Sequence, residues 1–248
     1  MSSKRIYRQD CSGARLTSFN VTVKETDLWI AVSSSAYSEN LPARVEQLIL
    51  NRRQALESHL ALYPHLASSL KPCLAGENAP EIFRRMVKAG NRAGVGPMAA
   101  VAGALAEEAG RFLETLSPEV IVENGGDIFI HVTEPVRVGI YAGSSPLSDR
   151  LALEIAPALT PLGVCTSSGT VGPSISMGRA DAAVALSRST PLADAAATAL
   201  GNLVQAPADL EKALEFACAT EGITGALLIC GEKIAAWGEI KLKRIKGV

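Results

Sequence analysis

Three short segments of the sequence combine residue types that could bind a small molecule. The first, Glu123-Asn-Gly-Gly-Asp127, stands between two runs of apolar residues. Gly125 and Gly126 carry no side chain, so backbone N–H groups there could approach a phosphate, while Asp127 could hold a ribose, an amide or a cation. The same residues suit the tight turn of a β-hairpin, because Asn-Gly accepts positive φ angles. Taken alone, the segment predicts a turn.

The second segment is Thr166-Ser167-Ser168-Gly169, which directly follows an apolar run. Hydroxyls mixed with glycine are common in solvated loops, and this reading is favoured for the segment by itself. The segment is not a G-x-S-x-G elbow and has no nearby histidine to activate a serine, which disfavours a serine hydrolase. Cys165, just before it, is either a thiol nucleophile or, more commonly for such a cysteine, buried packing.

The third segment runs from Leu192 to Leu200 and is rich in alanine. Asp194 and Thr198 are four residues apart, so on a helix they share one face and offer a carboxylate and a hydroxyl oxygen to the same point. Oxygen ligands of this kind suit Mg²⁺ or Ca²⁺. The alternative is that Asp194 only complements the positive end of its own helix, which begins near Pro191. Without further information the alternative is favoured.

The first half of the chain predicts a hairpin followed by helices. Alternating β-rich residues predict strands over 14–24 and 27–33, and apolar residues at spacings of three and four predict a helix over 41–62. Further helices are expected near 81–89 and over 98–116. The alanines of the last helix, together with Gly103, would let another backbone or a ligand come close.

The second half predicts mainly strands. These are expected over 120–123, 128–132, 136–141, 151–155, 164–166, 182–186, 226–229, 234–237 and 239–243. Thr190 as N-cap and Pro191 as first helical residue predict a helix to about 203, and a shorter helix is expected over 208–219. The basic tail over 241–246 is typical of a solvated edge strand. The pattern predicts an α+β fold over residues 1–248 with no internal domain boundary.

Composition excludes several classes of function. A net charge of −1 with 4% aromatic residues gives no basic field or stacking platform for nucleic acid. The chain has neither a secretory signal nor an apolar run long enough to span a bilayer, so we expect a cytoplasmic protein. Its five cysteines form no C-x-x-C pair and its three histidines are scattered, which disfavours disulfides and zinc.

Taken in order, the small-residue helix, GGDI, TSSG and LADAAATAL resemble the ApbE superfamily of FAD:protein FMN transferases. The match covers about residues 94–202 and implies an ApbE-like fold of mostly antiparallel sheets flanked by helices. It also implies that FAD or a related nucleotide binds at the turn and at the hydroxyl loop, namely Gly125, Gly126, Asp127, Thr166, Ser167, Ser168 and Gly169. By the same resemblance, Asp194 and Thr198 would hold Mg²⁺ against the pyrophosphate.

The sequence also departs from the transferases. Their H-x-x-D-P-x-T-G segment, with its catalytic histidine, is absent after Gly169, and so is their F-D-P-T-V-G-P-L segment. Gly96-Pro97-Met98 stands where they have Lys-Gly, and Cys11 follows Arg-Gln-Asp, which is not a lipoprotein cleavage site. The chain therefore resembles a soluble branch of the superfamily whose members have no assigned reaction. The resemblance suggests a link to sulfide-dependent homocysteine formation in anaerobes.

Three hypotheses of function follow. The leading one is a protein that binds a flavin nucleotide with Mg²⁺, as an enzyme or an accessory protein. The second is an active FMN transferase that modifies a protein partner, against which the missing histidine counts; His131 is the one replacement near a matched motif, on the same strand face as Asp127. The third is a non-catalytic scaffold that kept the fold.

Overall fold

The computed structural model describes residues 15–168 and 178–245. Cys11 and Gly169 therefore lie outside the described residues. The strands form one eight-stranded sheet in which all neighbours are antiparallel, and a second sheet of three strands. In order across the large sheet, the strands are β1 (Leu16–Val23), β2 (Thr26–Ser33), β3 (Val120–Asn124), β4 (Asp127–His131), β7 (Leu162–Ser167), β8 (Ala182–Ser187), β9 (Ile223–Cys230) and β10 (Lys233–Gly238).

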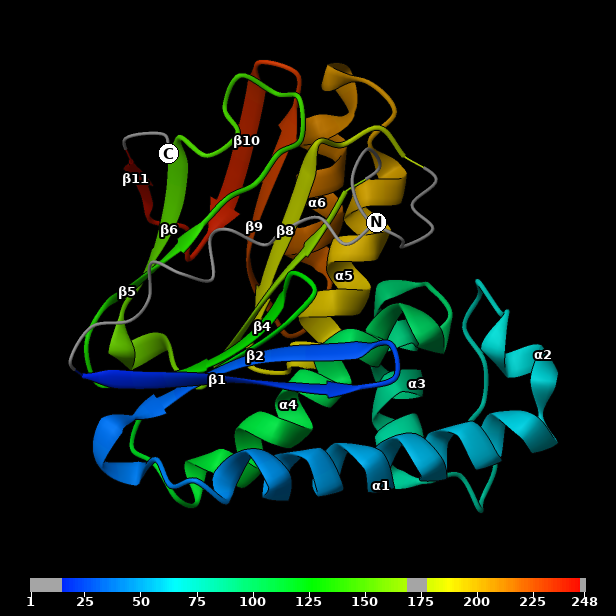
Figure 1. The fold of residues 1–248 in the computed structure, drawn as a ribbon. Helices are drawn as coiled ribbons and strands as arrows, with labels where there is room; N and C mark the ends of the chain where they lie inside the picture. Colours follow the sequence, from blue (N-terminus) through cyan, green and yellow to red (C-terminus); the bar gives the residue numbers. More distant parts are fainter. Residues whose placement is uncertain (1–14, 169–177, 246–248) are drawn as a thin grey trace.

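Helices cover one face of the large sheet, and the three-stranded sheet packs against β4, β7, β8 and β9 on the other face (Figure 1). The helices are α1 (Leu41–Leu62), α2 (Pro64–Ala67), α3 (Glu81–Ala93), α4 (Val101–Glu114), α5 (Thr190–Leu203) and α6 (Leu210–Ala219). The second sheet has the order β11 (Leu242–Arg244), β6 (Leu151–Ile155) and β5 (Val136–Gly139). The α+β class predicted from the sequence is confirmed.

Strand β8 shows why both faces are covered. Ala183 and Ala185 belong to the core beneath the helices, whereas Val184 and Leu186 belong to the core beneath the small sheet. Successive side chains of a strand point to opposite faces, so a strand with five successive apolar residues, such as 182–186, is expected to be buried on both sides. The small Ala side chains on the helical face let α5 approach the sheet closely.

Several predicted elements have the expected bounds. The first hairpin turns between Val23 and Thr26, where Lys24 has a φ of 54°, and α1 covers Leu41–Leu62 as predicted. The basic tail forms β11 at the edge of the three-stranded sheet. Its Lys241 Nζ lies 2.6 Å from Glu154 Oε1 of β6.

Other elements differ from their prediction. The helix expected over 98–116 is divided into a 3-10 turn, Pro97–Ala100, and α4. Thr190 is not an N-cap: it is the first residue of α5, Ser189 precedes it, and no side chain of α5 caps its own N-terminus. Among the described residues, no helix is both long and apolar enough to cross a membrane.

Candidate functional site

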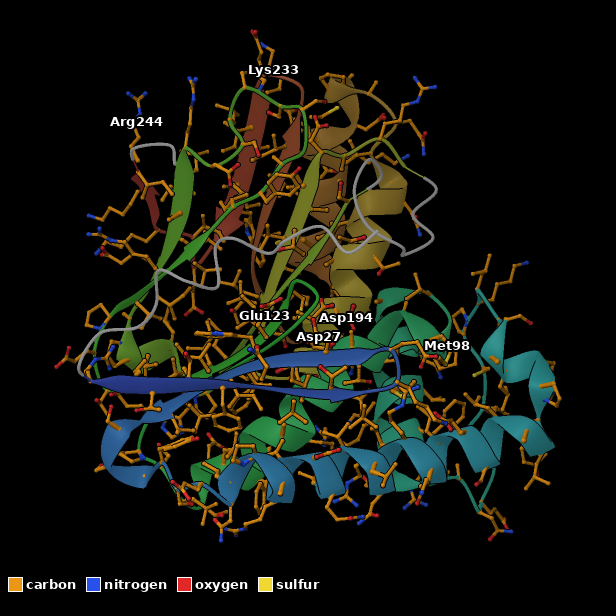
Figure 2. All side chains as sticks on the ribbon, viewed as in Figure 1. Asp27, Met98, Glu123, Asp194, Lys233 and Arg244 are labelled. Carbon is orange, nitrogen blue, oxygen red and sulfur yellow. The ribbon has the colours of Figure 1, made fainter. Side chains whose placement is uncertain are left out.

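Two carboxyl groups and a thiol lie together between the large sheet and α5. Asp127, the first residue of β4, is directly opposite Cys165 of β7. The Asp127 carboxyl lies close enough to the Cys165 thiol and to the Asp194 carboxyl of α5 for each to affect its pKa. Asp127 and Asp194 are each only 9% exposed, and Asp194 lies near the centre of the molecule (Figure 2). Two segments distant in sequence thus bring two acidic groups to one buried point.

Burial makes this point unfavourable for negative charge. Burial, with the nearby charge of Glu123, raises the pKa of Asp127 to about 7. Burial and the charge of Asp127 raise the pKa of Asp194 well above its usual range. Each carboxyl group therefore keeps a proton more readily than an exposed aspartate does, because ionising two adjacent buried carboxyl groups without a counter-ion is unfavourable.

The Cys165 thiol is also held in its neutral form. Burial, followed by the charges of Asp127 and Asp194, raises the pKa of Cys165 well above its usual range. Its Sγ also lies 3.5 Å from the backbone oxygen of Thr190, as donor. A buried thiol that keeps its proton is a poor nucleophile, so the structure favours the packing interpretation of Cys165.

Asp194 caps a helix, but the helix is α4 and not its own. The Gly103 backbone N–H donates to Asp194 Oδ2 over 2.8 Å. Gly103 lies in the first turn of α4, where backbone N–H groups have no acceptor within the helix. The alternative role predicted for Asp194, at the positive end of the helix starting near Pro191, is therefore wrong in its choice of helix.

Glycines permit the close approach of the elements around Asp194. A Cβ added at Gly103 would lie 2.7 Å from the Thr190 backbone oxygen and 2.8 Å from Asp194 Cβ. A Cβ added at Gly163 of β7 would lie 2.5 Å from Thr190 Cα. The small-residue face predicted around Gly103 is thus the surface on which α5 packs.

The predicted glycine turn is a hairpin between β3 and β4. Gly125 and Gly126 have φ angles of 70° and 120°, which side chains disfavour. Asn124 Nδ2 donates to the Ala102 backbone oxygen over 3.0 Å, which fastens the turn to α4. The Thr166 N–H donates to the Gly126 oxygen over 3.2 Å. The glycine turn and the start of the hydroxyl segment are therefore adjacent.

The hydroxyl side chains divide between the two faces of the sheet. Cys165 belongs to the core under the helices and Val164 to the core under the small sheet. By alternation, the Ser167 side chain shares the face of Cys165, and the Thr166 side chain points to the opposite face. Ser168 follows the end of β7 and is half-buried, as is Thr198, one helical turn beyond Asp194. Thr166 thus meets the glycine turn through its backbone.

The two aspartates could hold a Mg²⁺ ion that takes only one or two ligands from the protein. Across residues 15–168 and 178–245, no three or more His, Cys, Asp or Glu side chains are arranged to hold a metal ion. Mg²⁺ commonly takes only one or two carboxylates and completes its octahedron with water and substrate phosphates. Asp127 and Asp194 supply two neighbouring buried carboxyl groups, which suit an ion whose remaining ligands come with a nucleotide.

His131 lies at the other end of β4. Four residues of a strand span about 13 Å, and the His131 Nδ1 is 2.6 Å from Glu114 Oε1 of α4. Phe129, between Asp127 and His131 on the same face, packs in the core beneath α4 at Gly110. The position of His131 therefore ties it to Glu114 and not to the carboxyl pair.

Sequence reasoning missed Glu107 and Gly163. Glu107 is an acidic residue at the end of an apolar run, yet it is only 5% exposed. Gly163 interrupts the apolar residues of β7. An isolated Gly in a strand is a sign of close backbone approach, so Gly163 could have been noticed in the sequence. Nothing in the local sequence indicates that the Glu107 side chain is buried.

Comparisons with known proteins agree with this architecture. A family model described as AbpE bacteria matches residues 8–242. A UPF0280 protein of Methanosarcina acetivorans is 46% identical over 222 residues, which covers 88% of this chain and 85% of the relative. A UPF0280 protein of Methanocaldococcus jannaschii is 36% identical over 226 residues, covering 89% and 90% of the two chains.

Solved structures show a similar fold at low sequence identity. The apo flavinyl transferase ApbE of Pseudomonas stutzeri has a TM-score of 0.56 and 14% identity, covering 90% of this chain and 94% of its own. The apbe protein of Thermotoga maritima has a TM-score of 0.55 and 13% identity, covering 89% and 96%. The predicted fold is therefore shared with these proteins.

Proposed function

Because the chain belongs to the AbpE bacteria family, within the ApbE-like superfamily, we propose that it binds a flavin nucleotide together with Mg²⁺ at Asp127 and Asp194. The nucleotide is FAD or a similar dinucleotide. Two of the proteins that share its fold are flavin or flavinyl transferases, which supports a flavin as the ligand class. The reaction, and the link to homocysteine formation, stay predictions from the resemblance.

The carboxyl pair is the observation that carries this proposal. Asp127 and Asp194 are both buried, the pKa of each carboxyl group is raised, and Asp127 directly follows the glycine turn. A divalent cation would neutralise both carboxylates and also the oxygens of a bound pyrophosphate. A bound cation would thus neutralise the negative charge that protons neutralise when no cation is bound.

Other residues of the chain would bind the nucleotide itself. The hairpin of Gly125 and Gly126 presents backbone without side chains, and Asn124 fixes that hairpin against α4. Ser167 and Ser168 offer hydroxyls near the end of β7, and Gly169 continues that segment in the sequence. We propose that these groups contact the phosphates or the sugar, and that Thr198 adds a hydroxyl to the cation.

A titration of FAD tests the proposal. FAD absorbance and fluorescence would be followed in Mg²⁺ and in EDTA, with wild-type protein and with Asp194→Asn. Asparagine keeps an oxygen for the Gly103 N–H but loses the charge, so affinity in Mg²⁺ should fall at least about tenfold, or about 1.4 kcal/mol. The affinity in EDTA should change little.

A second buried aspartate provides the matched control. Asp181 is 8% exposed and its Oδ2 accepts the Gly231 N–H over 2.7 Å, away from the carboxyl pair. Asp181→Asn should leave the Mg²⁺-dependent part of FAD binding unchanged. Equal losses for Asp194→Asn in Mg²⁺ and EDTA would show that no cation acts at this site, and no FAD binding in either would refute the flavin.

A further inference from the structure

Glu107 joins α4 to α5 from a buried position. Its Oε2 accepts the Thr190 backbone N–H over 2.7 Å, and its side chain is 6% exposed. Thr190 is the first residue of α5, so its N–H has no acceptor within that helix. The carboxylate also complements the positive end of the α5 dipole. Glu107 of α4 therefore caps the N-terminus of α5, just as Asp194 of α5 caps the N-terminus of α4.

The two caps form a closed ring. Gly103 and Glu107 are one turn apart on α4, and Thr190 and Asp194 are one turn apart on α5. Glu107 accepts from Thr190, and Asp194 accepts from Gly103. Residues four apart share a helical face. A displacement of the first turn of α5 would therefore carry Asp194 away from Gly103.

A third helix holds Glu107 in place. Arg85 Nη2 of α3 donates to Glu107 Oε1 over 2.6 Å, and Arg111 Nε lies 3.5 Å from the same oxygen. One carboxylate oxygen is thus held by cations while the other holds α5. Because both carboxylate oxygens have partners, on α5 for one and on α3 and α4 for the other, the Glu107 side chain is held in one orientation.

We infer that Glu107 is a positioning residue, which sets the place of the Asp194 carboxyl by fixing the first turn of α5. The inference deepens the proposed function, and rests on it only for the cation. The ring also includes Thr190, whose oxygen accepts from Cys165, the cross-strand neighbour of Asp127. Glu107 therefore acts on both halves of the carboxyl pair without touching either.

Hydrogen exchange at one amide tests this inference directly. Amide exchange would be followed by two-dimensional NMR for wild type, Glu107→Ala and Glu107→Gln. The Gly103 N–H is held by Asp194, so its exchange should accelerate at least about tenfold in Glu107→Ala, equivalent to about 1.4 kcal/mol. Glutamine keeps an acceptor oxygen for Thr190 but loses the acceptor for Arg85, so it should restore slow exchange in part.

Two controls separate positioning from general destabilisation. Glu108 also binds Arg85, over 2.7 Å, but its other partner is Arg52 of α1, so Glu108→Ala should leave Gly103 exchange within about twofold of wild type. The fully buried Leu228 of β9 reports global opening in every sample. Equal acceleration at Gly103 and Leu228 in Glu107→Ala would overturn the inference.

Binding of Mn²⁺ alone gives the second measurement. If wild type binds Mn²⁺ through Asp194, Glu107→Ala should weaken that binding and Glu107→Gln should restore it in part. Failure of wild type to bind Mn²⁺ both alone and in the presence of FAD would count against the proposed function, while Gly103 exchange would still decide the role of Glu107. If Glu107→Ala does not fold, Glu107→Asp, which is one methylene shorter, takes its place. Unchanged Gly103 exchange in a folded variant would refute positioning.

Discussion

In the proposed function, a proton and a divalent cation would compete for the same oxygens of Asp127 and Asp194. The pKa of Asp127 is raised to about 7, whereas an unfolded chain gives an aspartate about 3.9. Without a cation, protonation therefore favours the folded state. That contribution is present in full below about pH 4 and is lost as the pH rises through about 7. Cation affinity should change in the opposite direction.

Replacement of Asp127 by asparagine tests this linkage. Between pH 5 and pH 8 in EDTA, the free energy of unfolding of wild type should fall relative to Asp127→Asn by roughly 2–3 kcal/mol, because asparagine does not ionise. Urea unfolding at the two pH values measures the difference. The exposed Glu232→Gln is the control, and it should follow wild type at both pH values. A constant gap between wild type and Asp127→Asn would mean that Asp127 titrates normally.

At the scale of elements, the contact of α4 with α5 depends on the absence of a side chain at Gly103. Alanine favours a helix over glycine by about 1 kcal/mol. In this helix, however, a new Cβ would lie 2.7 Å from the Thr190 oxygen and 2.8 Å from Asp194 Cβ. The first clash is with backbone, which cannot move without displacing the helix that carries Asp194.

Gly103→Ala should therefore destabilise the protein by roughly 1–3 kcal/mol in spite of its better helix propensity. It should also weaken FAD binding in Mg²⁺. Gly76→Ala is the control, because nothing lies within 4 Å of a Cβ added there. Urea unfolding and the FAD titration measure the two effects. A more stable Gly103→Ala protein would show that the helices can separate at no cost.

Local patterns predicted elements well where the determinants were local. Apolar spacing gave α1 its bounds, and alternation gave the first hairpin, because each depends on residues close in sequence. The start of α5 was misjudged because its cap is Glu107, which belongs to another helix. The pairing of Asp127 with Cys165 joins two strands that are not consecutive in the chain, and no local signal sets that register.

At the scale of the whole molecule, the fold of a transferase is present while the histidine expected after Gly169 is absent from the sequence. The three histidines of the chain stand elsewhere: His59 between Tyr63 and Phe83, His65 on α2, and His131 beside Glu114. General-base catalysis typically contributes about 10²–10⁴-fold to such a step. A protein can therefore share the fold of these transferases without transferring FMN.

We expect no transfer of FMN from FAD to a threonine-containing partner protein, even where FAD binds. The partner would be incubated with FAD, Mg²⁺ and the chain, and its intact mass measured. The flavinyl transferase ApbE of Pseudomonas stutzeri is the positive control, tested with the same partner. His131→Ala should change nothing. An FMN adduct that disappears in His131→Ala would establish transfer, with His131 as its base.

The pairing of β11 with β6 also orders events during synthesis of the chain. Leu242 lies opposite Leu153, and β7, β8, β9 and β10 are all made between these two strands. Ribosomes add about 5–20 residues per second, so β6 keeps one open edge while the large sheet is being completed. Open edges favour pairing with other chains. The small sheet, which packs against β4, β7, β8 and β9, is therefore completed only after the large sheet has been synthesised.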